Sequence, residues 1–295
     1  QEDGADNPAA AEVSSLSATA GDTRVTLQWK DPSPDTFDMI EITHTPGGSV
    51  PVTVAKGVET VTINGLVNRR LYEFSVMAVS TGKRTAGVKA QARPFPATVT
   101  LEISYEHGTN LSPRAWMNMY VIWIENSALN FLQNLRICER LISTTNPVTG
   151  IALPFWKMNR WGISDTDEVA AVTSATVANA DFTITRVLKD ITKHQFTVYF
   201  ETDRSFEPND WFNDQPALLY SAAVDLDSEV SEYELTPHGW TPNAETANVI
   251  PSTPAGALQR ELRYISHGKA GDGSFGSADA RSATSMVKRI ILRIR

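Results

Sequence analysis

The sequence predicts an all-β protein made of two β-sandwich domains, and three observations lead to this. Apolar and polar residues alternate in short runs along both halves of the chain, which is the period of half-buried strands. Gly, Pro, Asn and Asp interrupt these runs at short intervals, as they do in turns between antiparallel strands. The chain has 295 residues, so at roughly 150 residues per domain it is long enough for two separate cores.

The composition is that of a globular protein. Apolar residues make up 41% of the chain and charged residues 20%, and no long apolar stretch predicts a membrane-spanning helix. The formal charge of -8 repels phosphate backbones, so we expect no nucleic-acid partner. Cys138 is the only cysteine, which excludes an intramolecular disulfide and cysteine-based metal clusters. We expect it to be a buried strand residue.

Residues 1–10 predict a flexible acidic tether. The first eight residues read Gln-Glu-Asp-Gly-Ala-Asp-Asn-Pro, a polar, acidic and breaker-rich segment. Such a start resembles the segment after the lipidated cysteine of bacterial surface lipoproteins, although that cysteine is not in this sequence. We therefore expect export, with membrane attachment only through an N-terminal lipid anchor outside this sequence. The alternative is a start trimmed for expression.

Residues 11–96 are predicted to form the first sandwich. Inward-facing residues alternate with outward-facing ones in three clear runs: Val25, Leu27 and Trp29; Val50, Val52 and Val54; and Tyr72, Phe74, Val76 and Ala78. Gly47-Gly48 marks the hairpin turn before the second run. About seven such strands in roughly eighty residues indicate a sandwich. Pro94 and Pro96 end it, because prolines cannot continue a strand ladder.

The same residues resemble the fibronectin type III module. Val25-Thr26-Leu27-Gln28-Trp29 is similar to its second strand with the core tryptophan, and Ile63-Asn64-Gly65-Leu66 followed by Tyr72 resembles its tyrosine corner. The resemblance implies an immunoglobulin-like sandwich in which the Tyr72 hydroxyl binds backbone near Leu66. Modules of this family are usually spacers or interaction platforms, but a fold alone does not confer a function.

Residues 97–295 are predicted to form a larger antiparallel sandwich with long loops. Strand patterns occur at 99–105, 119–125, 182–187, 195–202, 218–224 and 287–294. The run at 119–125 is apolar on both faces, which predicts a central strand covered on both sides. Weak helical periodicity at 130–142 and 255–266 could equally be strand. Thr236-Pro237-His238-Gly239-Trp240 predicts a tight turn, with His238 as a turn residue.

Three segments of this second region resemble an uncharacterised family of periplasmic and surface proteins, known only as a domain of unknown function. The segments are 120–125, 171–176 and 196–201. In that family the middle motif continues into a Pro-Gly and a Trp-Asp-Gly turn, whereas this chain continues with residues 177–181 and has Leu188-Lys189-Asp190 instead. The resemblance implies export to the envelope and an immunoglobulin-like sandwich. It carries no established catalytic residues to this chain.

Loop residues of the second region supply two candidate sites. Tryptophans with Asn, Asp, Arg and Pro neighbours can stack on sugars while amides and carboxylates bind the hydroxyls; these candidates are Trp156, Trp161, Trp211 and Asn213. The alternative is that the rings pack the loops against the sandwich. Hard oxygen donors on a short turn are the ligands that calcium prefers, and here they are Asp225, Asp227 and Glu229. The alternative is a solvated acidic turn, and the sequence predicts no other cofactor.

No catalytic residues are predicted. The sequence has no His-Glu-x-x-His and no Gly-x-Ser-x-Gly motif, which excludes the common zinc protease and esterase patterns. We predict an exported, monomeric, non-catalytic protein of the bacterial cell surface or periplasm, whose second domain binds a glycan, a protein or another envelope component. The alternatives are a carbohydrate-active hydrolase with a carboxylate pair in the second-domain loops, and a purely structural or assembly protein.

Overall fold

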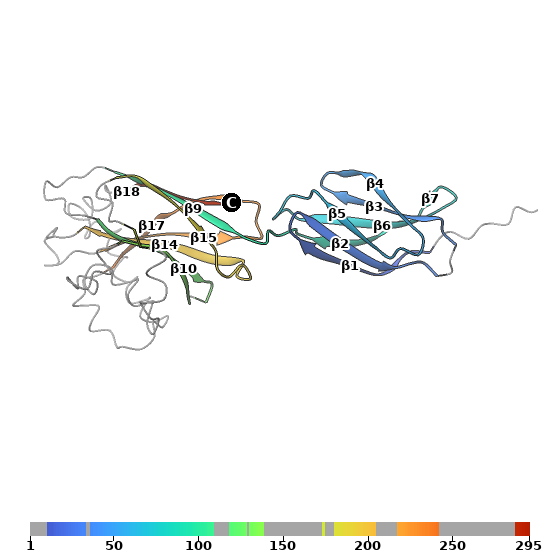
Figure 1. Cartoon of the computed structure of the whole chain (residues 1–295), viewed down its shortest axis with the longest axis horizontal. Coiled ribbons are helices and arrows are strands. Elements are labelled where there is room, and N and C mark those ends of the chain that lie inside the picture. The colour runs from blue at the N-terminus through green and yellow to red at the C-terminus, as the bar shows by residue number, and fades with distance from the viewer. Residues whose placement is uncertain are drawn as a thin grey trace, which may run out of the picture. The chain divides into compact units, whose positions relative to one another are not determined.

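The computed structural model describes residues 11–33, 36–108, 118–128, 130–138, 173–174, 180–204, 217–241 and 287–295. All regular elements in these ranges are β-strands, labelled β1 to β18 (Figure 1). The chain divides into two compact units between Ala97 and Thr98, except that Asp227–Glu229 belongs to the first unit. Each unit contains two sheets, as the all-β prediction requires. The described residues include no helix long and apolar enough to cross a membrane.

The first unit pairs a three-stranded sheet with a five-stranded sheet. The smaller sheet has the order β1-β2-β5, with β1 at Ser14–Gly21, β2 at Arg24–Lys30 and β5 at Thr60–Asn64. The larger sheet has the order β4-β3-β6-β7, and β8 also pairs with β6. Its strands are β3 (Met39–Thr45), β4 (Gly48–Ala55), β6 (Tyr72–Ser80), β7 (Lys83–Arg84) and β8 (Val88–Ala92). Gly47 has a φ of 88° in the turn between β3 and β4, which confirms the predicted hairpin.

The core of the first unit follows the predicted rows. Every second residue of β6 from Tyr72 to Ala78 is buried. Trp29 is also buried, and its Nε1 donates a hydrogen bond of 3.0 Å to Asp31 Oδ1. The Val67 N–H donates to the Tyr72 hydroxyl at 3.0 Å. The tyrosine therefore ties back to backbone beside Leu66, as the resemblance implied.

Strand β4 departs from the predicted inward row. Val54 is buried, but Val52 is 37% exposed and Val50 is 80% exposed. Strand β4 lies at the edge of its sheet, and its pairing with β3 becomes irregular between Ile42 and His44, next to the hairpin. The alternation correctly predicts that Val50, Val52 and Val54 share a face. Val50 and Val52 remain exposed because they lie on the irregular edge of the sheet.

The second unit pairs a six-stranded sheet, β12-β11-β10-β14-β15-β17, with a four-stranded sheet, β13-β9-β18-β16. The first sheet contains β10 (Asn118–Asn126), β11 (Phe131–Cys138), β12 (Thr173–Ser174), β14 (Gln195–Arg204), β15 (Ala217–Asp225) and β17 (Thr236–Thr241). The second contains β9 (Thr100–His107), β13 (Phe182–Val187), β16 (Glu232–Glu234) and β18 (Val287–Ile294). The ambiguous segment at 130–142 thus contains a strand, while 255–266 lies outside the described residues.

The predicted turn at Thr236–Trp240 is wrong, because these residues belong to β17. Strand β17 pairs antiparallel with β15, and the pairing skips His238 between Pro237 and Gly239. Proline is tolerated at sheet edges and bulges, and β17 ends the sheet in the described part of the chain. The Gly and Pro signals therefore mark a bulge in an edge strand. A second departure is the parallel pairing of β11 with β12 in a sandwich predicted to be antiparallel.

Both faces of β10 are buried, as predicted for 119–125. On one face, Tyr120 stacks on Phe182 of β13 with ring centroids 5.1 Å apart, so this face meets the four-stranded sheet. Tyr105 of β9 and Phe200 of β14 make the same kind of contact at 5.5 Å. On the other face, Trp123 is fully buried. Cys138 is buried as well and accepts a hydrogen bond from the Tyr120 N–H.

Candidate functional site

The predicted glycan site cannot be located among the described residues. Trp156, Trp161, Trp211 and Asn213 all lie outside the described ranges. The assignment of these four residues to a ligand site therefore stays a prediction.

The predicted calcium turn is described. Asp225 ends β15, and Asp227 and Glu229 are exposed in the turn after it. The Tyr233 hydroxyl donates to the Asp225 carbonyl at 3.1 Å, and the Leu226 N–H donates to the His194 carbonyl at 2.8 Å, so protein groups already fix the start of this turn. Within the described ranges, no three His, Cys, Asp or Glu side chains are grouped as a metal site. The calcium site stays a prediction.

Buried polar side chains gather on the six-stranded sheet, and the sequence pattern did not predict them. In the described part of the second unit they are Glu125, Gln133, Asn134, Arg136, Glu201 and Thr202. Burying a polar group costs free energy unless it is hydrogen-bonded, and burying a charge costs more unless it is paired. Each such group therefore has either a structural partner or a functional reason.

Gln133 has structural partners. Its Nε2 donates to the Val187 carbonyl, and its Oε1 accepts from the Lys189 N–H, both at 3.0 Å. These bonds join β11 of one sheet to the end of β13 in the other. Gln133 therefore closes the seam between the two sheets.

Glu125 and Glu201 share the second buried face of the sheet with two aromatic rings. Trp123 lies opposite Tyr199 in the pairing of β10 with β14, and their rings stack at 5.2 Å. The Trp123 Nε1 donates to Glu125 Oε1 at 2.8 Å. Because the strands are antiparallel, the two glutamates lie on opposite sides of the ring pair, four register positions apart.

This arrangement is structural. Four positions correspond to about 13 Å along the strands, wider than the gap of about 5–10 Å between the carboxyl groups of glycosidases. Trp123 and both glutamates are fully buried, so no ligand stacks on this ring. The signal in the sequence is the repeated aromatic-x-Glu motif, Trp123-Ile124-Glu125 and Tyr199-Phe200-Glu201.

Arg136 is different, because it is buried without a charged partner in the described ranges. It faces Ile122 across the β11–β10 pair, on the face that meets the four-stranded sheet. The residue is 5% exposed, and its guanidinium lies 4.2 Å from the Phe182 ring centroid and 5.4 Å from that of Tyr120. Its Nε has no hydrogen-bond partner in that part of the chain. The signal was a single charge in the otherwise apolar run Leu135-Arg136-Ile137-Cys138.

Arg186 brings a second guanidinium to the same seam. It lies on β13, and its Nε donates to the Leu135 carbonyl at 2.7 Å while Nη1 donates to the Thr185 carbonyl at 2.9 Å. Burial, and after it the positive charge of Arg136, lower the pKa of Arg186 below its usual value. Neither arginine forms an ion pair with a described Asp or Glu. Two adjacent guanidinium groups can bind a carboxylate or a phosphate.

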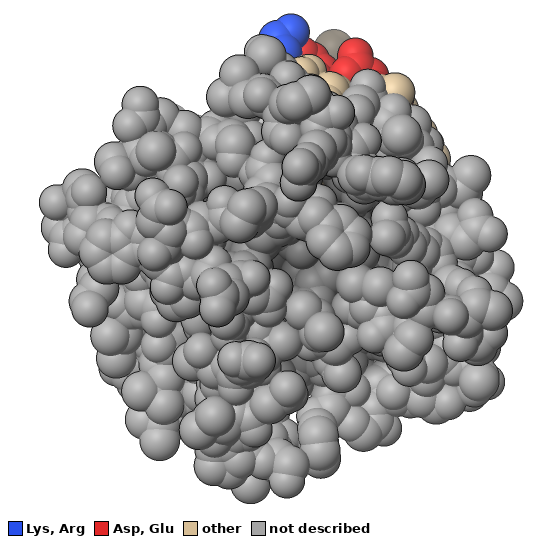
Figure 2. Space-filling view, turned by 90° about the vertical axis from the view of Figure 1, so that its left-hand side faces the viewer, with Lys and Arg blue, Asp and Glu red and all other residues tan. Residues whose placement is uncertain are grey.

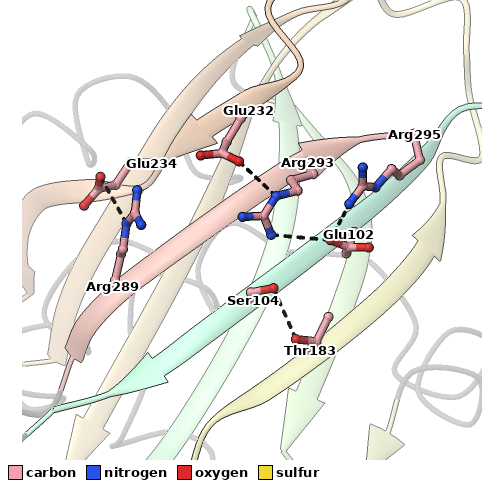
Figure 3. A network of polar contacts seen from close by, with 8 residues as sticks. All are labelled: Glu102, Ser104, Thr183, Glu232, Glu234, Arg289, Arg293 and Arg295. Carbon is pink, nitrogen blue, oxygen red and sulfur yellow. Dashed lines mark hydrogen bonds and ion pairs between the residues drawn. The ribbon is translucent and has the colours of Figure 1, made fainter.

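The arginines on the outer face of the four-stranded sheet show the opposite situation (Figure 3). Arg293 of β18 contacts both Glu102 and Glu232, and Arg295 contacts Glu102. A further two ion pairs are Arg289 with Glu234 and Lys288 with Glu106. Figure 2 also shows basic and acidic side chains side by side at its upper edge, where described residues are visible. This face neutralises its own charge, and exposed pairs of this kind contribute little stability.

Glu102 in this network is expected to titrate below its ordinary pKa of 4.5. The hydrogen bond from Arg295 is the main cause that lowers the pKa, and Arg293 adds to it. A carboxyl group with a lowered folded-state pKa stabilises the protein above its unfolded pKa, and this stabilisation is lost as the pH falls through the folded-state value. An NMR titration should therefore give a higher Glu102 pKa in Arg295→Met than in the wild type. Equal values near 4.5 in both proteins would contradict this.

The comparisons with known proteins identify the first unit. The family model described as "Fibronectin type III domain" matches residues 11–91. Residues 11–91 are a fibronectin type III domain. The two sheets, the buried Trp29 and the bond from Val67 to the Tyr72 hydroxyl are the features expected of this domain. Proteins with fibronectin type III domains are often extracellular or cell-surface binding modules.

Three solved structures are also similar to parts of the chain. A two-domain segment of chicken tenascin is 12% identical, covers 73% of this chain and 99% of that segment, and has a TM-score of 0.29. The CNTN1 FN1-FN3 domains from chicken are 13% identical, with coverages of 78% and 76% and a TM-score of 0.27. The chicken interferon gamma receptor alpha chain is 12% identical, with coverages of 66% and 91% and a TM-score of 0.26. No curated protein matches the chain.

Proposed function

We propose that the protein is an exported, non-catalytic binding protein of the bacterial cell surface or periplasm. The fibronectin type III domain carries this proposal, because such domains are often extracellular or cell-surface binding modules. The bacterial and envelope parts rest on the resemblance of residues 115–225 to an envelope family. Attachment through a lipid anchor outside this sequence and a monomeric state belong to the same proposal.

The fibronectin type III domain serves as the support in this proposal, and the second domain holds the ligand. In the first domain two polar groups of the core bind within the domain: Trp29 Nε1 binds Asp31, and Arg84 pairs with the buried Glu41. The second domain buries a charged side chain that has no such partner among described residues, Arg136. A group that costs stability without an internal partner is a candidate for function.

The ligand that we propose is a glycan. Trp156, Trp161 and Trp211 supply ring faces for sugar stacking, and Asn213 supplies an amide for the hydroxyls. Asp225, Asp227 and Glu229 are proposed to bind calcium, which would order the turn after β15. An envelope protein is the other candidate ligand, and a polysaccharide titration distinguishes the two.

Alanine substitution of Trp156, Trp161 or Trp211 is expected to weaken glycan binding about tenfold or more with little change in stability. The measurement is tryptophan fluorescence of the full chain titrated with neutral and acidic polysaccharides, in calcium and then in chelator. Trp29→Phe is the control, because this buried residue belongs to the first domain. A loss of about 3 kcal/mol or more in stability would instead assign the ring to loop packing.

The outcomes separate the parts of the proposal. A saturable signal that disappears with chelator supports both the glycan and the calcium site. A saturable signal that persists in chelator supports the glycan and rules out a calcium requirement. Unchanged affinity in all three alanine variants, or no response to any polysaccharide, overturns the glycan site and leaves an envelope protein as the ligand to test.

A further inference from the structure

Two arginines lie at the seam between β11 and β13, one on each sheet of the second unit. Arg136 is held by ring faces, since its guanidinium lies over Phe182 at 4.2 Å. Arg186 is held by its hydrogen bonds to the carbonyls of Leu135 and Thr185. Leu135 is the chain neighbour of Arg136, so the bond from Arg186 holds the Arg186 guanidinium beside the segment of β11 that carries Arg136. Both groups are therefore positioned before any ligand arrives.

This pairing of like charges has no compensation in the described parts of the chain. Neither arginine makes an ion pair there, and Arg136 Nε has no hydrogen-bond partner. The protein carries a formal charge of -8, and the arginines of the outer sheet face, Arg289, Arg293 and Arg295, all pair with glutamates (Figure 3). Arg136 and Arg186 thus contrast with the paired arginines of the outer sheet face.

The ring contacts of Arg136 do not by themselves require a charged side chain. An apolar side chain of similar length, such as methionine, would pack on the same two rings without the cost of burying a charge. The planar guanidinium offers several N–H donors in a fixed fork, which matches the geometry of oxyanions. Stacking on Phe182 and Tyr120 orients that fork.

We propose that Arg136 and Arg186 form a binding site for one oxyanion group, a carboxylate or a phosphate, carried by the ligand of the second domain. This proposal depends on the proposed function in one respect: it assigns the oxyanion group to the ligand of the second domain. With a glycan as the ligand, the group is the carboxylate of an acidic sugar or a phosphate substituent. Inorganic phosphate and acetate are the simplest probes of the two chemistries.

The test is thermal unfolding of the full chain in sodium chloride, acetate and phosphate at matched ionic strength and neutral pH. An anion that binds only the folded protein raises the melting temperature, by about 3 °C or more at ten times its Kd. We expect this rise in the wild type and not in Arg136→Met or Arg186→Met. Arg289→Met is the matched control, because it removes the same charge from an exposed, paired site, and it should respond like the wild type.

The comparison in chloride alone gives a second readout. Removing an uncompensated buried cation should raise the melting temperature of Arg136→Met above that of the wild type, whereas breaking a compensated pair would lower it. A lower value overturns the proposal, since the guanidinium is then paired within the chain. In the comparison with added anion, an equal rise in melting temperature in the wild type and all three variants also overturns the proposal. Phosphate stabilises proteins generally by exclusion from their surface, so an equal rise needs no binding site.

The melting experiments with acetate and phosphate test the oxyanion site, and the polysaccharide titration tests the glycan function, so one proposal can fail while the other stands. A rise with acetate alone assigns a carboxylate, and a rise with phosphate alone assigns a phosphate. If the anion response requires both arginines but no polysaccharide binds, the oxyanion site stands and the glycan function fails. If an acidic polysaccharide binds Arg136→Met and Arg186→Met as tightly as the wild type, the glycan function stands and the oxyanion site fails.

Discussion

Trp123→Ala is expected to destabilise the second domain by about 3–5 kcal/mol, as truncation of a large buried aromatic residue does. Trp123 is fully buried, and its ring stacks on Tyr199 at 5.2 Å. The substitution removes this contact and leaves a cavity that a β-sheet cannot easily close. It also removes the Nε1–H that binds the buried Glu125 carboxyl group at 2.8 Å, and loss of a partner for a buried charged group adds to the cost.

Urea unfolding followed by near-ultraviolet circular dichroism of the second domain measures this effect. Trp123→Phe keeps an aromatic ring on Tyr199 but lacks the Nε1–H, so it should be less destabilising and should isolate the hydrogen bond. Val187→Ala is the surface control, because Val187 is 54% exposed, and it should change stability by no more than about 0.5 kcal/mol. A loss below about 1 kcal/mol in Trp123→Ala would show that Trp123 is not part of a packed core.

Local periodicity explains what the sequence could predict. The row from Tyr72 to Ala78 is buried at every second residue, because the side chains of a strand alternate between two faces. Strand β18 occupies Val287–Ile294, the same bounds as the predicted run. The tyrosine corner was predicted from the resemblance to the fibronectin type III module, and the Val67 N–H, five residues from Tyr72, supplies the bond to its hydroxyl.

Pairing between distant residues explains what the sequence could not predict. The bulge that skips His238 arises from the register of β17 on β15, whereas the residues themselves have the composition of a turn. The exposure of Val50 arises from the edge position of β4. In both cases the local pattern leaves the neighbouring strand unspecified, and that neighbour decides between a turn and a strand, or between core and solvent.

The candidate site shows the same limit for charged residues. Arg136 and Arg186 lie on different sheets and are 50 residues apart in the chain, and only their strands' packing brings them together. The tryptophans singled out by composition were predicted to lie in loops, while the buried arginine lies within a strand. A charge inside an apolar strand run indicates an unusual site, but the identity of its neighbours comes from the tertiary structure.

The buried glutamates illustrate why the aromatic-x-Glu motif had no clear meaning in sequence. In each copy the aromatic residue and the glutamate share a face because they are two residues apart. Antiparallel pairing then places the two rings together and the two carboxyl groups apart. A parallel pairing in the same register would have brought the carboxyl groups together, so the direction of pairing separates a structural cluster from a paired-carboxylate site.

Phe74→Ala is expected to destabilise the fibronectin type III domain by about 3–5 kcal/mol. Phe74 is fully buried in the middle of β6, which pairs with both β3 and β8, and its ring lies 6.2 Å from that of Tyr72 and 5.7 Å from that of His44. The ring belongs to the core cluster of the domain, so its removal leaves a cavity there. A domain of this size has a total stability of about 5–15 kcal/mol, so the variant loses a large part of it.

Urea unfolding of the full chain tests this expectation. One signal must report unfolding of the first domain and a second signal unfolding of the second domain. Val50→Ala is the control from the same domain, because Val50 is 80% exposed, and it should change the free energy of unfolding by no more than about 0.5 kcal/mol. Since each unit has its own buried core, Phe74→Ala should leave the midpoint of the second domain unchanged, and Trp123→Ala should leave that of the first unchanged. Additive losses in the double variant are expected for two independent cores, whereas a shift of both midpoints by either substitution would show that the domains unfold as one unit.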